Sequence, residues 1–177
     1  LTNKNIGQQT TSSNLLRNSS FELNPLTTPN LWQTSGLGAS NVAEWSEEQA
    51  ASGNHALKIT ATLPSNRGWP GWITQIKHRS NSGYLIQAKY FTTDGANAWL
   101  EISFLDSNNK LLKGFSTGCP RTSVKSQWTL IQHKVKSEWI PEQSSALRIG
   151  LRQCLNHTKG RQTTLFFDDV SLQLISD

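Results

Sequence analysis

Leu165-Phe166-Phe167-Asp168-Asp169-Val170-Ser171-Leu172-Gln173-Leu174 is the stretch, near the end of the chain, on which the predicted fold depends. If it runs extended, side chains alternate between its two faces, so Asp168 shares a face with Phe166 and Val170. That face is otherwise apolar, which predicts that it is buried. A buried carboxylate needs strong hydrogen-bond donors or a cation, because leaving it unpaired costs several kcal/mol. A hard cation with oxygen ligands, such as calcium, would meet that need.

The opposite end of the chain has a similar composition. In Asn14-Leu15-Leu16-Arg17-Asn18-Ser19-Ser20-Phe21-Glu22, a carboxylate again follows apolar residues and an aromatic, and we expect this segment to form the first strand. In a sandwich closed by its terminal strands, Glu22 and Asp168 would meet. A third segment lies between them in the chain, Ser52-Gly53-Asn54-His55-Ala56-Leu57-Lys58-Ile59.

These three segments resemble a carbohydrate-binding module of the calcium-containing β-jelly-roll type, which is related to the galactose-binding-like domains. The family pattern runs roughly N-L-L-x-N-x-x-F-E, S-G-x-x-A-L, Y-x-hydrophobic-x-A and F-x-D-D-V-x-L, and the match spans Asn14 to Leu174. The resemblance implies an all-β fold, a two-sheet antiparallel β-sandwich. It also implies carbohydrate binding without catalysis, as an appendage to an enzyme or surface protein.

The resemblance further implies a structural calcium ion that ties the two ends of the sandwich together. Glu22 and Asp168 match acidic positions of the family motifs, and Asn54, in the Ser-Gly-Asn turn, would supply its backbone carbonyl. Asp169 would replace Asp168 if the assignment of faces is wrong by one residue. The alternative is that Glu22 caps local backbone and Asp168 pairs with an arginine.

The length of 177 residues suits one domain with a sizeable core. The chain lacks methionine, so we expect a processed piece of a larger multidomain protein, with residues 1–13 as a flexible N-terminal linker and 14–177 as a single module. No stretch approaches the roughly 20 apolar residues that cross a bilayer, so membrane insertion is not expected. The abundance of uncharged polar residues favours an extracellular location, secreted or on the cell surface.

The formal net charge is +5, but the basic residues are scattered, which argues against nucleic-acid binding and indicates mostly solvated faces. Lys89, Arg148 and Arg152 give a weak preference for an acidic polysaccharide. Cys119 and Cys154 match no metal-binding spacing, so they either pair or both stay free. For an extracellular chain we favour the disulfide.

Many short strands separated by turns, without a convincing amphipathic helix, predict a sandwich. Three segments alternate most clearly, and their predicted core residues are Tyr84, Ile86, Ala88, Tyr90, Leu100, Ile102, Phe104, Leu147, Ile149 and Leu151. If these strands are neighbours in one sheet, as the resemblance implies, one outer face carries Gln87, Lys89, Trp99, Glu101, Arg148 and Arg152. Indoles stack on the apolar face of a sugar, and the polar groups bind its hydroxyls. The alternative is that Lys89, Glu101 and Arg148 form solvated cross-strand ion pairs.

The seven tryptophans divide into two groups. Trp69, between Gly68 and Pro70 in a loop, is the best candidate for a platform under a sugar ring. Trp72 and Trp99 are further candidates, as is Trp139. We expect core or structural positions for Trp32, Trp45 and Trp128.

Enzymatic activity is not expected. A glycosidase needs two carboxylates across a cleft, whereas Glu47 and Glu48 are adjacent and would point apart in a strand. Gln75-Ile76-Lys77-His78 is similar to the Q-I-H motif of jelly-roll alginate lyases, but the extra Lys77 places Gln75 and His78 on opposite faces of a strand.

The sequence therefore predicts a non-catalytic, calcium-stabilised module that binds a polysaccharide. The leading alternative is a structural or adhesive domain of the same fold that contacts other proteins in a surface assembly. A polysaccharide lyase is the weaker alternative.

Overall fold

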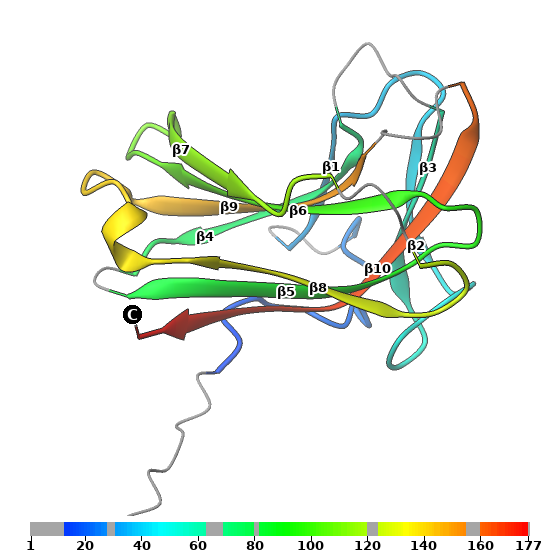
Figure 1. Ribbon diagram of the computed structural model, residues 1–177, viewed down its shortest axis with the longest axis horizontal. Coiled ribbons are helices and arrows are strands. Elements are labelled where there is room, and N and C mark those ends of the chain that lie inside the picture. The colour runs from blue at the N-terminus through cyan, green and yellow to red at the C-terminus, as the bar shows by residue number, and fades with distance from the viewer. Residues whose placement is uncertain are drawn as a thin grey trace, which may run out of the picture.

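The computed structural model is a sandwich of two antiparallel sheets (Figure 1). It describes residues 13–27, 31–62, 69–79, 82–119, 124–154 and 160–176. Sheet A has the strand order β1-β4-β9-β6-β7, and sheet B has the order β2-β3-β10-β5-β8. The elements are β1 (Gln33–Ser35), β2 (Val42–Ser46), β3 (Ala56–Thr62), β4 (Gly71–Lys77), β5 (Gly83–Phe91), β6 (Asn97–Leu105), β7 (Leu111–Ser116), β8 (Thr129–Val135), the 3-10 helix η1 (Ser137–Trp139), β9 (Ala146–Cys154) and β10 (Gln162–Ile175). The predicted all-β, two-sheet antiparallel sandwich is confirmed.

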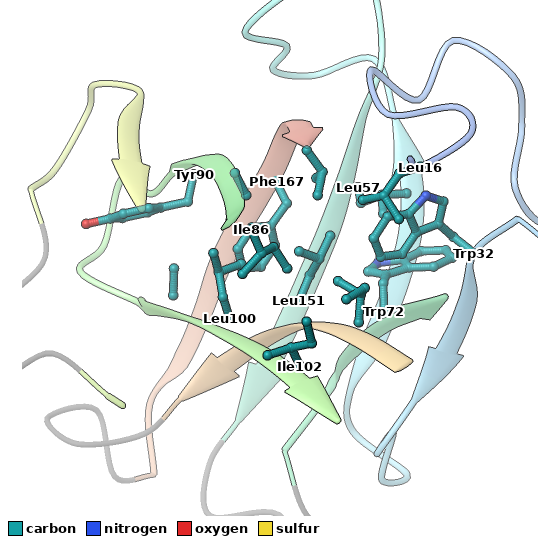
Figure 2. Close-up of a cluster of buried hydrophobic side chains, with 14 of the residues drawn as sticks. Leu16, Trp32, Leu57, Trp72, Ile86, Tyr90, Leu100, Ile102, Leu151 and Phe167 are labelled. Atoms are coloured by element: carbon teal, nitrogen blue, oxygen red, sulfur yellow. The ribbon is translucent and has the colours of Figure 1, made fainter. Parts of the chain in front are cut away.

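The core lies between the two sheets and is built by alternation along the strands (Figure 2). Ile86, Leu100 and Leu151 are fully buried, and the predicted core residues of all three alternating strands point inward. Each large apolar side chain that leaves water in this way contributes about 1.5–3 kcal/mol. Trp32, predicted to be structural, is also buried in this core.

β10 contains a bulge that the sequence did not reveal. Its pairing with β5 shifts register between Asp168 and Ser171, and Asp169 has a positive φ of 48°. A bulge adds one residue to a strand, so the alternation changes parity there. Phe167 and Val170 therefore both face the main core, whereas Phe166 joins a second, smaller cluster. The prediction that Phe166, Asp168 and Val170 share one face was wrong for this reason.

The N-terminal segment 14–22 is not the strand that we expected. Asn18 and Phe21 have positive φ angles of 49° and 57°, which an extended strand does not allow. The segment nevertheless lies along β10, because Leu15 N–H donates to the Leu172 carbonyl at 2.8 Å. The buried side chains of Leu16 and Phe21 anchor it in the core. The two ends of the described chain therefore do converge, while residues 1–12 of the predicted linker lie outside the described part.

The predicted disulfide is confirmed between Cys119, which follows β7, and Cys154, at the end of β9. It closes a sequence separation of 35 residues, for which restriction of the unfolded chain gives about 3–4 kcal/mol of stabilisation. Over the described ranges, the structure has no helix long and apolar enough to span a membrane.

Candidate functional site

Two tryptophans lie together on the outer face of sheet A. Trp69 lies two residues before the start of β4, and Trp99 lies on β6. Their ring centroids are 5.4 Å apart with an interplanar angle of 65°, the edge-to-face arrangement that aromatic pairs prefer. Trp69 is 37% exposed and Trp99 is half-buried. Trp69 therefore supplies most of the indole surface that faces solvent, and the packing of the two rings restricts the movement of both.

An ion pair beside these indoles anchors the backbone of Trp69. The guanidinium of Arg152, on β9, donates to Glu101 Oε1 at 2.9 Å and to the Trp69 carbonyl at 3.2 Å. The side chains of Arg152 and Glu101 are only 11% and 21% exposed, which makes the pair more rigid than a typical surface pair. We call Trp69, Trp99, Glu101 and Arg152 the tryptophan cluster.

Gly150 provides the space in which the Glu101 side chain lies. The two residues face each other in the register of β6 and β9, and a Cβ built on Gly150 would lie 2.4 Å from Glu101 Cγ. Any larger residue at position 150 would displace this carboxylate from Arg152. No sequence pattern indicated this role of Gly150.

A shallow pocket continues the same face toward β1 and β4. Its lining consists of Leu31, Gln33, Ile73, Thr74, Gln75 and Arg148. The Gln75 amide donates to Asn109 Oδ1 at 2.8 Å, which holds that side chain in place. Gln33 and Ile73 were not predicted, because β1 is only three residues long and too short to show alternation, and its pairing with β4 is not visible in the sequence.

The face as a whole offers the chemistry that a sugar polymer requires. Indole rings stack on the apolar C–H face of a pyranose, and amide, carboxylate and guanidinium groups bind its hydroxyls. The tryptophan cluster and the pocket together extend this chemistry along one surface of sheet A.

Two of the predicted binding residues lie elsewhere. β5 belongs to sheet B, where it lies between β10 and β8, so Gln87 and Lys89 are on the opposite side of the sandwich from Trp99. Gln87 donates to Gln132 at 2.9 Å, and Lys89 donates to Asp169 at 2.8 Å. The expectation of one shared face was wrong because alternation assigns faces within a strand but does not show which sheet the strand joins.

Trp72 is also excluded as a platform for a sugar. It is fully buried between the sheets, and its indole N–H donates to the Lys58 carbonyl at 3.3 Å. Trp139 is exposed and lies on η1, where it stacks on Phe115 with a centroid separation of 6.0 Å. Trp45 stacks on His55 and Trp128 packs near Phe91, so both have the structural positions that we expected.

Asp168 is fully buried, as predicted, and its partners are backbone N–H groups. Oδ2 accepts from Ala51 at 2.7 Å and Ser52 at 3.0 Å, and Oδ1 accepts from Asp169 at 2.7 Å. Burial raises the pKa of Asp168 above its usual value, although these N–H groups oppose the shift. In the described chain no arginine pairs with Asp168, so that alternative is not supported.

Glu22 holds the other end of the same turn. Its carboxylate accepts from the backbone N–H groups of Asn54 and His55, each at 3.2 Å. Burial raises the pKa of Glu22, but the bonds from Asn54 and His55 outweigh it and leave the pKa below its usual value. Gly53, with φ +62°, allows the close approach, since a Cβ there would lie 2.4 Å from Glu22 Oε1.

The structure thus brings Glu22, Asn54 and Asp168 to one turn, residues 51–55. Both carboxylates face N–H donors there, whereas calcium requires six to eight oxygen ligands. Within the described ranges, no group of three or more His, Cys, Asp or Glu side chains is placed to hold a metal ion. The donor set around the two carboxylates gives the calcium prediction no support of its own, and it stays a prediction.

The residues of the lyase-like motif do not form a site. Gln75 lies on the outer face of β4, and His78 Nδ1 contacts the Tyr84 hydroxyl at 2.9 Å beside the core residue Phe104. Burial lowers the pKa of His78. The two side chains point to different sides, as expected from their spacing.

Comparisons with known proteins give similarity at the level of structure. No protein-family model matches the chain, and no curated protein matches it. The CBM22-1 xylan-binding domain of Xyn10C from Paenibacillus barcinonensis superposes with a TM-score of 0.62 at 17% identity, over 90% of this chain and 93% of that one. A CBM4 module superposes with a TM-score of 0.59 at 15% identity, over 90% and 99%.

A third structure is part of a much larger chain. The enzymatically active domain of tailspike protein 4 from bacteriophage CBA120 matches with a TM-score of 0.65 at 11% identity, over 92% of this chain and 21% of that one. Identities this low show the fold alone. The chain therefore has the β-sandwich fold that carbohydrate-binding modules also have.

Proposed function

We propose that this chain is a non-catalytic module that binds a polysaccharide on the outer face of sheet A. The observation that carries the proposal is the Trp69–Trp99 pair, in which Trp69 is exposed, beside the Glu101–Arg152 ion pair that also anchors the Trp69 carbonyl. A rigid aromatic surface bordered by fixed polar groups binds sugars at a small cost in conformational entropy.

The structural neighbours support this assignment. The xylan-binding domain and the CBM4 module have almost the same extent as this chain, so the likeness covers a whole module. Because the same fold makes up a fifth of the tailspike chain, we infer that this chain is likewise part of a larger protein. The Cys119–Cys154 disulfide supports a secreted or cell-surface location, since disulfides persist in oxidising compartments.

The acidic residues on this face support binding without cleavage. Within the strands of sheet A, Glu101 is the one acidic residue, and it is paired with Arg152. Hydrolysis of a glycosidic bond by the usual route needs a second carboxylate across the cleft.

A structural calcium ion at the 51–55 turn is a separate proposal, and chelation with EDTA tests it.

Affinity electrophoresis against a panel of soluble polysaccharides tests the proposal. We expect at least one polymer to retard the protein, and Trp69→Ala to abolish most of the retardation. Trp139→Ala is the matched control, because Trp139 is 39% exposed and Trp69 is 37% exposed. Equal effects of the two substitutions, or no retardation by any polymer, would contradict the proposed site.

The edge strand β7 favours a second candidate function, contact with another protein in a surface assembly. Leu111 and Leu112 on this strand are 56% and 36% exposed, and β7 pairs only with β6 among the described strands. Unpaired edges and exposed apolar residues are common at protein interfaces. Stable self-association in light scattering, together with no binding to any polysaccharide, would favour this function over the first.

A further inference from the structure

Arg148, on the outer face of sheet A, has no anionic partner in the parts of the chain that the structure describes. It lies in the middle of the sheet, opposite Gln75 on one side and Ser103 on the other. None of the ion pairs found among the described residues includes Arg148, and its Nε is buried without a hydrogen-bond acceptor. A half-buried guanidinium in this state favours a ligand that brings negative charge.

The other basic residues expected to favour an acidic ligand are already compensated. Arg152 is paired with Glu101, and Lys89 is paired with Asp169 on the opposite sheet. The preference for an acidic ligand therefore depends on Arg148, with Lys77 an exposed cation further along the same face. Of the three basic residues first considered, Arg148 in its pocket is therefore the one that remains able to bind an acidic ligand.

The pocket around Arg148 suits one sugar residue that carries a carboxylate. Gln33 and Gln75 supply amide donors and acceptors for hydroxyl groups, and Ile73 supplies an apolar surface for the C–H face. The guanidinium is planar and binds a carboxylate through two parallel hydrogen bonds. Carboxylate, hydroxyl and C–H groups occur together in a uronic acid.

The tryptophan cluster and the Arg148 pocket lie within reach of one polymer. Arg148 and Arg152 are four residues apart on β9, which corresponds to about 13 Å along the strand. Gly150 lies between them and carries no side chain, and the Glu101 side chain lies over it. An oligosaccharide can span this separation, whereas a single sugar cannot.

We propose that the ligand is an anionic polysaccharide, one of whose uronic acid residues places its carboxylate on Arg148 in the pocket of Gln33, Ile73 and Gln75. This inference rests on the proposed function, because it names the ligand class of the same face. In this inference, Arg148 makes the face bind charged polysaccharides more tightly than uncharged ones. The tryptophan cluster contributes affinity for the sugar rings of either kind.

Calorimetric titration of the full chain tests the inference. The probes are glucuronoxylan, polygalacturonate and alginate, each compared with the same polymer after chemical reduction of its carboxyl groups. We expect the acidic form of at least one polymer to bind about tenfold or more tightly than its reduced form, because one charge-assisted pair is lost on reduction. Raising the ionic strength should weaken only the acidic form.

Two variants separate the pocket from general electrostatic attraction. Arg148→Gln should lower affinity for the acidic polymer about tenfold and leave affinity for the reduced polymer within about twofold. Lys134→Gln is the matched control, because it removes the same charge from an exposed position on β8 in sheet B. Thermal unfolding verifies that both variants fold, and Gln75→Ala gives a second test of the pocket that leaves net charge unchanged.

The outcomes distinguish this inference from the proposed function. Binding of acidic and reduced polymers with equal affinity would overturn the role of Arg148 and leave the polysaccharide-binding function intact. A loss of affinity that is equal in Arg148→Gln and Lys134→Gln would also overturn it. Binding to dextran sulfate but to no uronic polymer would overturn the carboxylate assignment. Binding to no polymer at all would overturn both proposals.

Discussion

Asp168→Ala is predicted to destabilise the fold more than any surface acidic substitution. The side chain accepts three backbone N–H groups, from Ala51, Ser52 and Asp169, and its removal leaves them without acceptors. An unsatisfied buried donor costs about 1–3 kcal/mol. Ser52 is exposed, so water can satisfy its N–H. The N–H groups of Ala51 and Asp169 are then the two donors whose loss of an acceptor costs stability.

The expected loss is about 2–4 kcal/mol in the free energy of unfolding, since removal of a buried charge offsets part of the cost of two orphaned donors. For a chain of this size, that corresponds to a fall of about 5–15 °C in Tm. The measurement is urea unfolding followed by tryptophan fluorescence, with calorimetry for Tm. Because the pKa of Asp168 is raised in the folded state, its favourable effect on stability is greatest below the unfolded pKa and is lost as the pH rises through the folded pKa.

Asp106→Ala is the matched control. Its carboxylate accepts from Asn108 at 2.8 Å and from Lys110 at 2.9 Å in an exposed turn, so its loss should cost about 1 kcal/mol or less. Equal destabilisation by the two substitutions, or a loss below about 1 kcal/mol for Asp168→Ala, would refute the reasoning from buried donors. EDTA adds the test for calcium: a bound ion predicts that chelation lowers Tm of the wild type but not of Asp168→Ala.

Three further predictions concern other parts of the fold. Gly150→Ala should displace the Glu101 side chain and weaken polysaccharide binding, while the free energy of unfolding changes by less than about 1 kcal/mol; titration and urea unfolding measure the two effects. Reduction of the Cys119 disulfide should lower the free energy of unfolding by about 3–4 kcal/mol, and unfolding with and without reductant measures this. Burial raises the pKa of Asp169, but the Lys89 ammonium and a serine hydroxyl lower it more. Its contribution to stability is therefore present above the unfolded pKa and lost as the pH falls through the folded pKa; Asp169→Asn should flatten the acid limb of a pH series, and an unchanged slope would contradict this.

The sequence predicted those features that depend on local periodicity. Ile86, Leu100 and Leu151 are buried because a strand of either sheet turns alternate side chains toward the core, and this alternation is visible in the sequence. The convergence of the two chain ends was also predicted, through Glu22 and Asp168, and both reach the same turn.

The features that were missed depend on long-range or strained geometry. The bulge at Asp169 reverses the faces on either side of it, and no residue type marks a bulge of this kind uniquely. The assignment of Gln87 to the binding face failed because the sheet that a strand joins is decided by pairing across the chain. Trp72 is buried rather than exposed because alternation along β4 continues to its second residue, directly after the loop.

The positions of these groups separate the residues that stabilise the fold from those of the proposed binding face. Asp168 and Glu22 fix a turn next to sheet B, whereas the tryptophan cluster and Arg148 lie on the outer face of sheet A. The two sets share no hydrogen bond among the described residues, and the core lies between the sheets. Substitutions at distant sites without common partners usually have additive effects. If the outer face of sheet A binds a polysaccharide as proposed, its residues, and with them the sugar that is bound, can change without loss of the contacts that join the two ends of the chain.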